Sequence, residues 1–153
     1  MSWFKKTTKT GPKPSTTAPA AKGGQPNMDQ MVRMLASAPE EKRTSMLSDR
    51  LAVFAGQDEV SRERGMKGML VAALQLPEDD YQKIAASRFR AVNELDQETR
   101  MTLMMSHAAT VKSLAPEQQQ KEMKAMKQIV SGLPEDKRDQ TMKMMRDLGL
   151  MGG

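Results

Sequence analysis

The thioether side chains of methionine are the groups in this sequence whose number and spacing could support a specific chemistry. There are 16 methionines among the 153 residues, and Met28, Met31 and Met34 follow one another at intervals of three. Thioethers that share one helical face can bind Cu(I), a soft ion. The same spacing is that of a stripe of core residues, and the chain has no cysteine and a single histidine. We therefore expect no metal and no cofactor.

Groups suited to catalysis are scarce. His107 is the only histidine, and the sequence indicates neither a carboxylate to orient it nor a substrate pocket beside it. The sequence contains no motif of a nucleotide-binding loop, of a zinc-protease helix or of the nucleophile turn of hydrolases. Acidic clusters stand at predicted helix starts, where carboxylates complement the helix dipole without a metal: Glu40-Glu41, Asp58-Glu59, Glu78-Asp79-Asp80 and Glu135-Asp136. We therefore predict a protein that is not an enzyme.

The surplus of methionine also fits a surface that binds another protein. Methionine is flexible and polarizable, so surfaces rich in it bind varied apolar partners, as in helix-in-groove recognition. Successive positions on a helix are about 100° apart, which means that clustered methionines cannot all face inward. The predicted partner-binding residues are Met101, Met104, Met105, Met142, Met144 and Met145. The alternative is that the methionines pack an adaptable core.

The C-terminal segment carries a resemblance to a known family. Met142-Lys143-Met144-Met145-Arg146, with Met151-Gly152-Gly153 beyond it, resembles the methionine-rich basic tail of the signal-binding domain in the signal-recognition-particle protein. The arginine-rich RNA-binding segment of that family is missing, so the chain is not assigned to it. What the resemblance implies is a site for an apolar peptide.

Residues 1–27 differ from the rest of the chain in composition and charge. They contain five lysines and no acid, and residues 5–27 include no large apolar side chain. Such a segment cannot bury enough surface to offset its ordering entropy, so we predict a disordered basic tail. With the five lysines set aside, 19 basic residues remain against 19 acidic ones, which leaves residues 28–153 neutral.

Three roles remain open for this tail. Its charge would attract the phosphates of nucleic acid or anionic lipid. Two aromatic residues beside the lysines would suit insertion into a membrane interface, and the third role is a solubilising extension without a ligand. The expected contact residues are Trp3, Phe4, Lys5, Lys6, Lys9 and Lys13.

The sequence also indicates where the protein resides. No apolar run approaches the ~20 residues of a membrane span, and no apolar stretch of a signal peptide follows Lys5 and Lys6. The lack of cysteine fits a reducing compartment. We expect a cytoplasmic protein, either free or peripheral to a membrane.

Residues 28–153 show a repeated helical pattern. Pro39, Pro77 and Pro116 open predicted helices at steps of 38 and 39 residues. A period of about 38 with two helices per unit lies near that of HEAT-type repeats. We predict an all-α domain over residues 28–153 with about seven short helices, at 28–37, 39–55, 58–75, 77–94, 96–114, 116–132 and 134–148. The six helices after the first would pair into three tandem hairpins at 39–76, 77–115 and 116–153. The hairpins would form either a HEAT-like stack or a compact bundle.

These features favour a non-catalytic scaffold or adaptor. The expected partner is another protein, bound through a methionine-rich helical face with the basic tail as an auxiliary contact. Two alternatives remain: a nucleic-acid-binding protein that acts through the lysines of the tail, and peripheral membrane attachment through Trp3 and Phe4 with those lysines.

Overall fold

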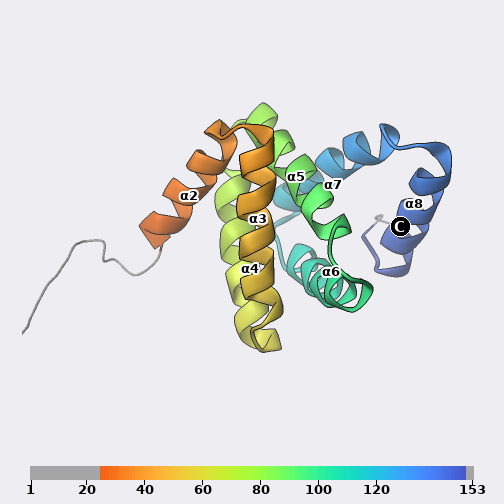
Figure 1. Cartoon of the computed structure of the whole chain (residues 1–153), viewed down its shortest axis with the longest axis horizontal. Helices are drawn as coiled ribbons and strands as arrows, with labels where there is room; N and C mark the ends of the chain where they lie inside the picture. Colours follow the sequence, from red (N-terminus) through yellow and green to blue (C-terminus); the bar gives the residue numbers. More distant parts are fainter. Residues whose placement is uncertain (1–24, 151–153) are drawn as a thin grey trace, which may run out of the picture.

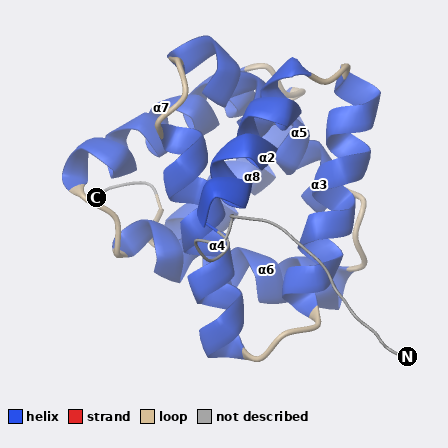
Figure 2. Cartoon of the chain, turned by 90° about the vertical axis from the view of Figure 1, so that its left-hand side faces the viewer, coloured by secondary structure: helices blue, strands red, loops and turns tan. Residues whose placement is uncertain are grey.

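The chain is helical throughout the part that is described. A computed structural model describes residues 25–150, with side chains from Met28 onward, and this part contains no strand. Figure 1 shows its seven helices, which are α2 (Gln25–Ser37), α3 (Glu40–Ala55), α4 (Glu59–Leu74), α5 (Glu78–Asn93), α6 (Gln97–Lys112), α7 (Pro116–Ser131) and α8 (Glu135–Asp147). Figure 2 shows the same helices from the side, joined by short loops. The predicted all-α fold of about seven short helices is confirmed.

The helices begin at a constant spacing. From α3 to α8, each helix starts 19 residues after the one before, at Glu40, Glu59, Glu78, Gln97, Pro116 and Glu135. Asp58 caps α4 by accepting the Ser61 N–H at 2.8 Å, and Asp96 caps α6 by accepting the Thr99 N–H at 3.2 Å. Proline stands before or at the first residue of the other four helices, where its fixed φ suits the chain entering a helix. The structural unit is thus one helix and its turn, half of the predicted repeat.

The observed helix ends lie close to the predicted ones. From α3 to α8 they agree within two residues, because proline and aspartate mark the starts so clearly. The exception is α2, which begins at Gln25 instead of residue 28, so residues 25–27 are helical. The rest of the predicted tail lies outside the described residues.

Each helix from α2 to α7 packs most extensively on a helix two positions away along the chain. The most extensive contacts join α3 with α5, α2 with α4, α4 with α6, and α5 with α7. Helices three positions apart also touch, as in the pairs α2 and α5, α3 and α6, and α4 and α7. Consecutive helices share less contact than any of the four pairs that lie two positions apart. The described chain therefore winds as a compact coil of helices, and its grouping into three hairpins stays a prediction.

Two arginine–serine hydrogen bonds repeat along this coil. Arg43 Nε on α3 donates to Ser87 Oγ on α5 at 2.9 Å, and Arg62 Nε on α4 donates to Ser106 Oγ on α6 at 2.8 Å. Each guanidinium also donates to the carbonyl five residues earlier in the chain. Both serines are buried, so loss of either bond would leave a polar group without a partner at a packed surface. These bonds fix helices two positions apart at one register.

Gly65 allows α3 and α4 to approach closely. A Cβ atom at Gly65 would lie 2.8 Å from Cε1 of Phe54, whose ring is buried. At Gly68, one turn further along α4, a Cβ atom would meet Met28 Cε at 3.9 Å, an ordinary van der Waals distance. The packing of α3 on α4 therefore requires a residue without a side chain at Gly65, whereas the position of Gly68 has room for one.

We expect Gly65→Ala and Gly68→Ala to change stability in different directions. Alanine stabilises a helix interior by about 1 kcal/mol relative to glycine, and nothing at Gly68 opposes this gain. At Gly65 the new methyl group would clash with Phe54, and overpacking costs ~1–3 kcal/mol. Urea unfolding should place the free energy of unfolding of Gly68→Ala above wild type and that of Gly65→Ala at or below it. Equal gains in both variants would contradict the close packing of α3 on α4.

Candidate functional site

Four polar side chains meet inside the coil, around Glu122 of α7. Arg88 of α5 donates from Nη2 to Glu122 Oε2 at 2.7 Å, and His107 Nε2 of α6 lies 2.9 Å from the same oxygen. The hydroxyl of Tyr81, also on α5, donates to Glu122 Oε1. Glu122 is only 3% exposed, while the side chain of His107 remains 20% exposed. The sequence indicates no carboxylate beside His107, whereas the structure places Glu122 there.

The spacing of the helices explains why this polar cluster is hard to find in the sequence. Glu122 lies 15 residues from His107 and 34 from Arg88 along the chain, so no short motif joins them. The 19-residue unit does contain a signal. The positions equivalent to Glu122 in the four preceding units are Met46, Gly65, Ile84 and Leu103. An acidic residue at a position that is otherwise apolar or glycine indicates a buried charge with a partner.

The surroundings of Glu122 hold it in its charged form. Burial alone would raise the pKa of its carboxyl, but the charge of Arg88 and the bonds from His107 and Tyr81 lower that pKa to about 2. Burial raises the pKa of the Tyr81 hydroxyl, which therefore stays protonated. A carboxylate with such a low pKa is a poor general base. Glu122 is therefore placed to orient Arg88 and His107 and not to accept a proton from a substrate.

One position of the 19-residue unit faces the inside of the coil in six successive helices. This inner line consists of Arg50, Met69, Arg88, His107, Met126 and Met145, one from each helix from α3 to α8. All six side chains line a run of small spaces within the coil. The helical repeat therefore brings thioethers and basic groups together on one concave surface.

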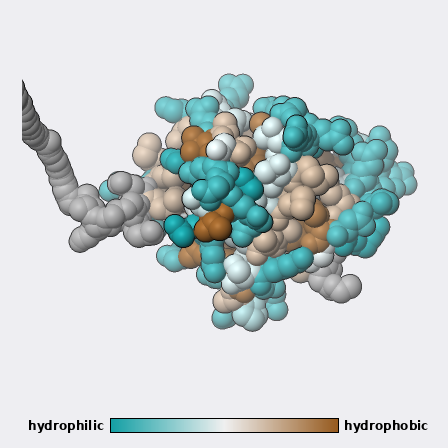
Figure 3. All heavy atoms as spheres, turned by 90° about the horizontal axis from the view of Figure 1, so that it is seen from below, coloured by the Kyte–Doolittle hydropathy of each residue, from teal (hydrophilic) through white to brown (hydrophobic). Residues whose placement is uncertain are grey.

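Three adjoining spaces along the inner line form a central groove. Their volumes are about 50, 70 and 120 Å³. The first and second share Met66 and Arg88 as walls, the second and third share Phe89 and Met104, and His107 borders all three. Figure 3 shows apolar side chains, in tan and brown, reaching the surface between hydrophilic ones. Protein interiors contain few voids larger than a water molecule, so three adjoining spaces of this size are a distinct feature of the coil.

The widest of these spaces lies between α6, α7 and α8. α8 packs mainly on α7 and, unlike α4 to α7, makes no extensive contact with the helix two positions before it. Lys112 at the end of α6 and Gly149 after α8 line this space. They lie so close together that a Cβ atom on Gly149, whose φ is +77°, would come within 3.1 Å of Lys112 Nζ. The space exists because the last helix does not repeat the packing of the others.

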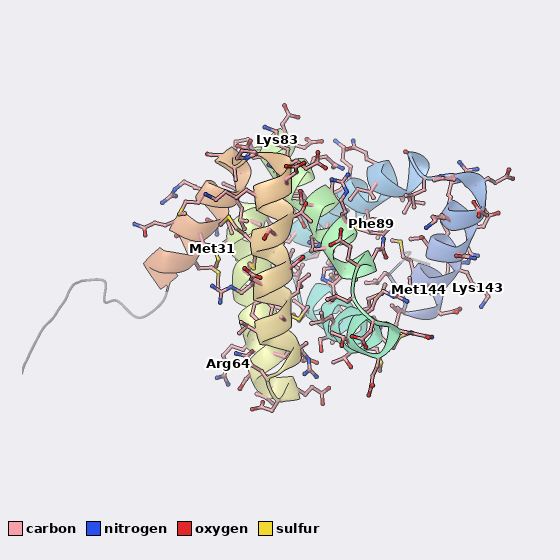
Figure 4. All side chains as sticks on the ribbon, in the orientation of Figure 1. Met31, Arg64, Lys83, Phe89, Lys143 and Met144 are labelled. Carbon is pink, nitrogen blue, oxygen red and sulfur yellow. The ribbon has the colours of Figure 1, made fainter. Side chains whose placement is uncertain are left out.

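Two of the six methionines predicted to bind a partner line the central groove. These are Met104, which is half-buried, and Met145, which is buried. The other four do not line it: Met101 and Met105 are 42% and 59% exposed, and Met142 and Met144 are half-buried on α8, where Figure 4 labels Met144. The predicted tail contacts all lie outside the described residues: Trp3, Phe4, Lys5, Lys6, Lys9 and Lys13.

Several groove residues were not predicted. Four methionines and one aromatic residue belong to the walls: Met66, Met69, Met123, Met126 and Phe89, the last labelled in Figure 4. Local clustering of methionine was the signal used for the prediction, whereas groove residues are related by the 19-residue step. In that step Met69, Met126 and Met145 occupy equivalent positions.

Comparison of the chain with protein-family models, with curated proteins and with solved structures finds no match. None of the described helices is long and apolar enough to cross a membrane. Within residues 25–150 no group of three or more His, Cys, Asp or Glu side chains is arranged to hold a metal ion. The central groove and the polar cluster beside it are therefore the features from which a function can be argued.

We expect Glu122→Gln to destabilise the protein strongly at neutral pH. The substitution leaves the charge of Arg88 without its carboxylate, and breaking a buried ion pair costs ~3–5 kcal/mol. The matched control is Glu40→Gln, because Glu40 pairs with Arg90 at an exposed site, where ion pairs contribute ~0–1 kcal/mol. Urea unfolding at pH 7 compares the two free energies. Similar losses would contradict a structural role for the polar cluster.

The same variant should also change the dependence of stability on pH. The pKa of Glu122 falls from 4.5 to about 2 on folding, so the stability due to its charge is present above pH 4.5. That contribution is lost as the pH falls towards 2, when Glu122 becomes protonated beside Tyr81, Arg88 and His107. The melting temperature, measured by thermal unfolding between pH 6 and pH 2, should therefore fall less steeply with pH in Glu122→Gln than in wild type. Parallel curves would show that Glu122 does not carry the shifted pKa.

Proposed function

We propose that this protein is a non-catalytic adaptor that binds an amphipathic helix of another protein in the central groove. The observation that carries the proposal is the inner line, which presents thioether or basic side chains from six successive helices to one concave surface. Methionine side chains repack around apolar groups of different shape, which suits them to peptide recognition.

The dimensions of the groove support a helix as the ligand. An amphipathic helix is recognised through side chains at positions i, i+3 or i+4, and i+7, and the groove offers three adjoining spaces, one for the end of each of three such side chains. The space beside α8, at about 120 Å³, approaches the ~150 Å³ of an apolar cavity that binds benzene. It has room for the larger part of a leucine or phenylalanine side chain.

The polar cluster supports a binding function in preference to catalysis. Glu122 has a pKa of about 2 and accepts from Tyr81 and Arg88, so it is a poor proton acceptor for a substrate. Its bonds instead hold Arg88 and His107 in fixed positions on the groove wall, and a preorganised wall lowers the entropic cost of binding. The basic tail is proposed as an auxiliary contact, and a cytoplasmic location stays a prediction.

Substitution of one wall methionine should weaken binding of a helical peptide. The probe is a fluorescein-labelled amphipathic helix with leucine at positions i, i+4 and i+7, measured by fluorescence polarisation. Met104→Gln places an amide on the wall of the groove, and we expect about a tenfold loss of affinity, as for a central interface residue. Met105→Gln is the matched control, since Met105 is the next residue but is 59% exposed.

Two results would contradict the proposed function. One is the absence of saturable binding by apolar helical peptides to the full chain. The other is a larger loss of affinity in Met105→Gln than in Met104→Gln, which would move the binding surface to the outside of the coil. Circular dichroism of both variants, with wild-type helix content expected, establishes that the effect is on binding.

A further inference from the structure

More of the charged side chains that line the central groove are basic than acidic. Arg50, Arg88 and Lys112 are basic, and Glu122 is the acidic one among the described lining residues. Glu122 forms an ion pair with Arg88, with 2.7 Å between Nη2 and Oε2. Lys112 lies against Gly149 just beyond the C-terminal end of α8, where a positive charge is favourable to the helix dipole. Arg50 is therefore the charge whose purpose is still to be explained.

Arg50 differs from other arginines of the coil in its hydrogen-bond partners. Arg43, Arg62 and Arg100 donate to serine or carbonyl oxygens, and Arg88 donates to a carboxylate as well as to the thioether of Met126. Arg50 Nη2 donates to the thioether of Met31, at 3.5 Å, and makes no hydrogen bond to an oxygen of the described residues. Thioether sulfur is a weak acceptor, whereas the planar guanidinium suits a carboxylate with two parallel bonds.

Arg50 lies at the wall of the groove, where its remaining guanidinium N–H donors can meet a ligand. It is the first member of the inner line, is half-buried on α3, and borders the space of about 50 Å³ together with Arg88 and His107. The other walls of this space are apolar and include Leu47, Leu51 and Met69. A charge in such surroundings is less screened by water than one on the surface, so an anion brought beside it would be held more strongly.

We infer that Arg50 recognises a carboxylate on the helix that occupies the groove, so that the partner segment is an amphipathic helix with an acidic residue beside its apolar side chains. The inference rests on the proposed function and adds the chemistry of its ligand. The acidic side chain lies at the α3 end of the groove, and the largest apolar side chain fills the space beside α8. The tail of this chain is excluded as the ligand by its charge, since residues 1–27 contain five lysines and no acid.

The experiment compares three peptides that differ in one residue. Each has leucine at positions i, i+4 and i+7, and the residue one turn before the first leucine is Glu, Gln or Lys. For the wild-type chain we expect the Glu peptide to bind about tenfold more tightly than the Gln peptide, since a hydrogen bond to a charged group is stronger than one between neutral groups. The Lys peptide should bind most weakly, and raising the salt concentration should reduce the differences.

Variants of the protein assign this preference to one side chain. Arg50→Met keeps much of the side-chain length and removes the charge, so it should bind the Glu and Gln peptides with equal affinity. Arg64→Met is the matched control, because Arg64 is an exposed arginine on α4 (Figure 4) that does not line the groove. It should retain the full preference for the Glu peptide.

The possible failures separate the inference from the proposed function. If the Glu and Gln peptides bind wild type with equal affinity, the groove binds helices but Arg50 does not recognise an acid. Tighter binding of the Lys peptide, or of a peptide with the sequence of residues 1–12, would overturn the assigned ligand chemistry and favour the tail as the occupant. If none of these peptides binds, the proposed function fails and the inference fails with it.

Discussion

Every helix from α2 to α7 makes its most extensive contact with a helix two positions away along the chain. Polar bonds hold these pairs in place: Arg43 to Ser87, Arg62 to Ser106, and Tyr81 to Glu122. Because the pairs are held at equivalent positions, side chains 19 residues apart come to face the same interior surface. The central groove is a direct result of this geometry, and so is the meeting of Arg88, His107 and Glu122 from three different helices.

Glu122 is where this packing departs from a purely apolar interior. An ion pair inside a protein adds little net stability compared with apolar residues of the same size, so its presence calls for another benefit. Here the carboxylate fixes Arg88 and His107, and those two side chains border the groove. A wall of flexible methionines thereby includes a rigid polar section, which limits how far the groove can change shape.

Much of the helical pattern could be predicted from local signals. Proline and aspartate set the helix starts by their own backbone and hydrogen-bonding preferences, so the limits of α3 to α8 were predicted closely. The site could not be predicted in the same way. Which methionines line the groove depends on packing between helices two apart, and local clustering favoured Met101 and Met105, which are exposed. The pairing of His107 with Glu122 needs α6 and α7 to be placed in space.

The position of α8 at the end of the coil affects how the protein moves. Helices inside the coil are held on several sides, whereas α8 packs mainly on α7. In a linear array of units, the end unit opens at the lowest free energy and its amide hydrogens exchange with solvent most readily. Opening of α8 would enlarge the space beside Met145 while the arginine–serine bonds of α3 to α6 stay intact. The coil thus combines a stable interior with an end helix whose opening leaves that interior in place.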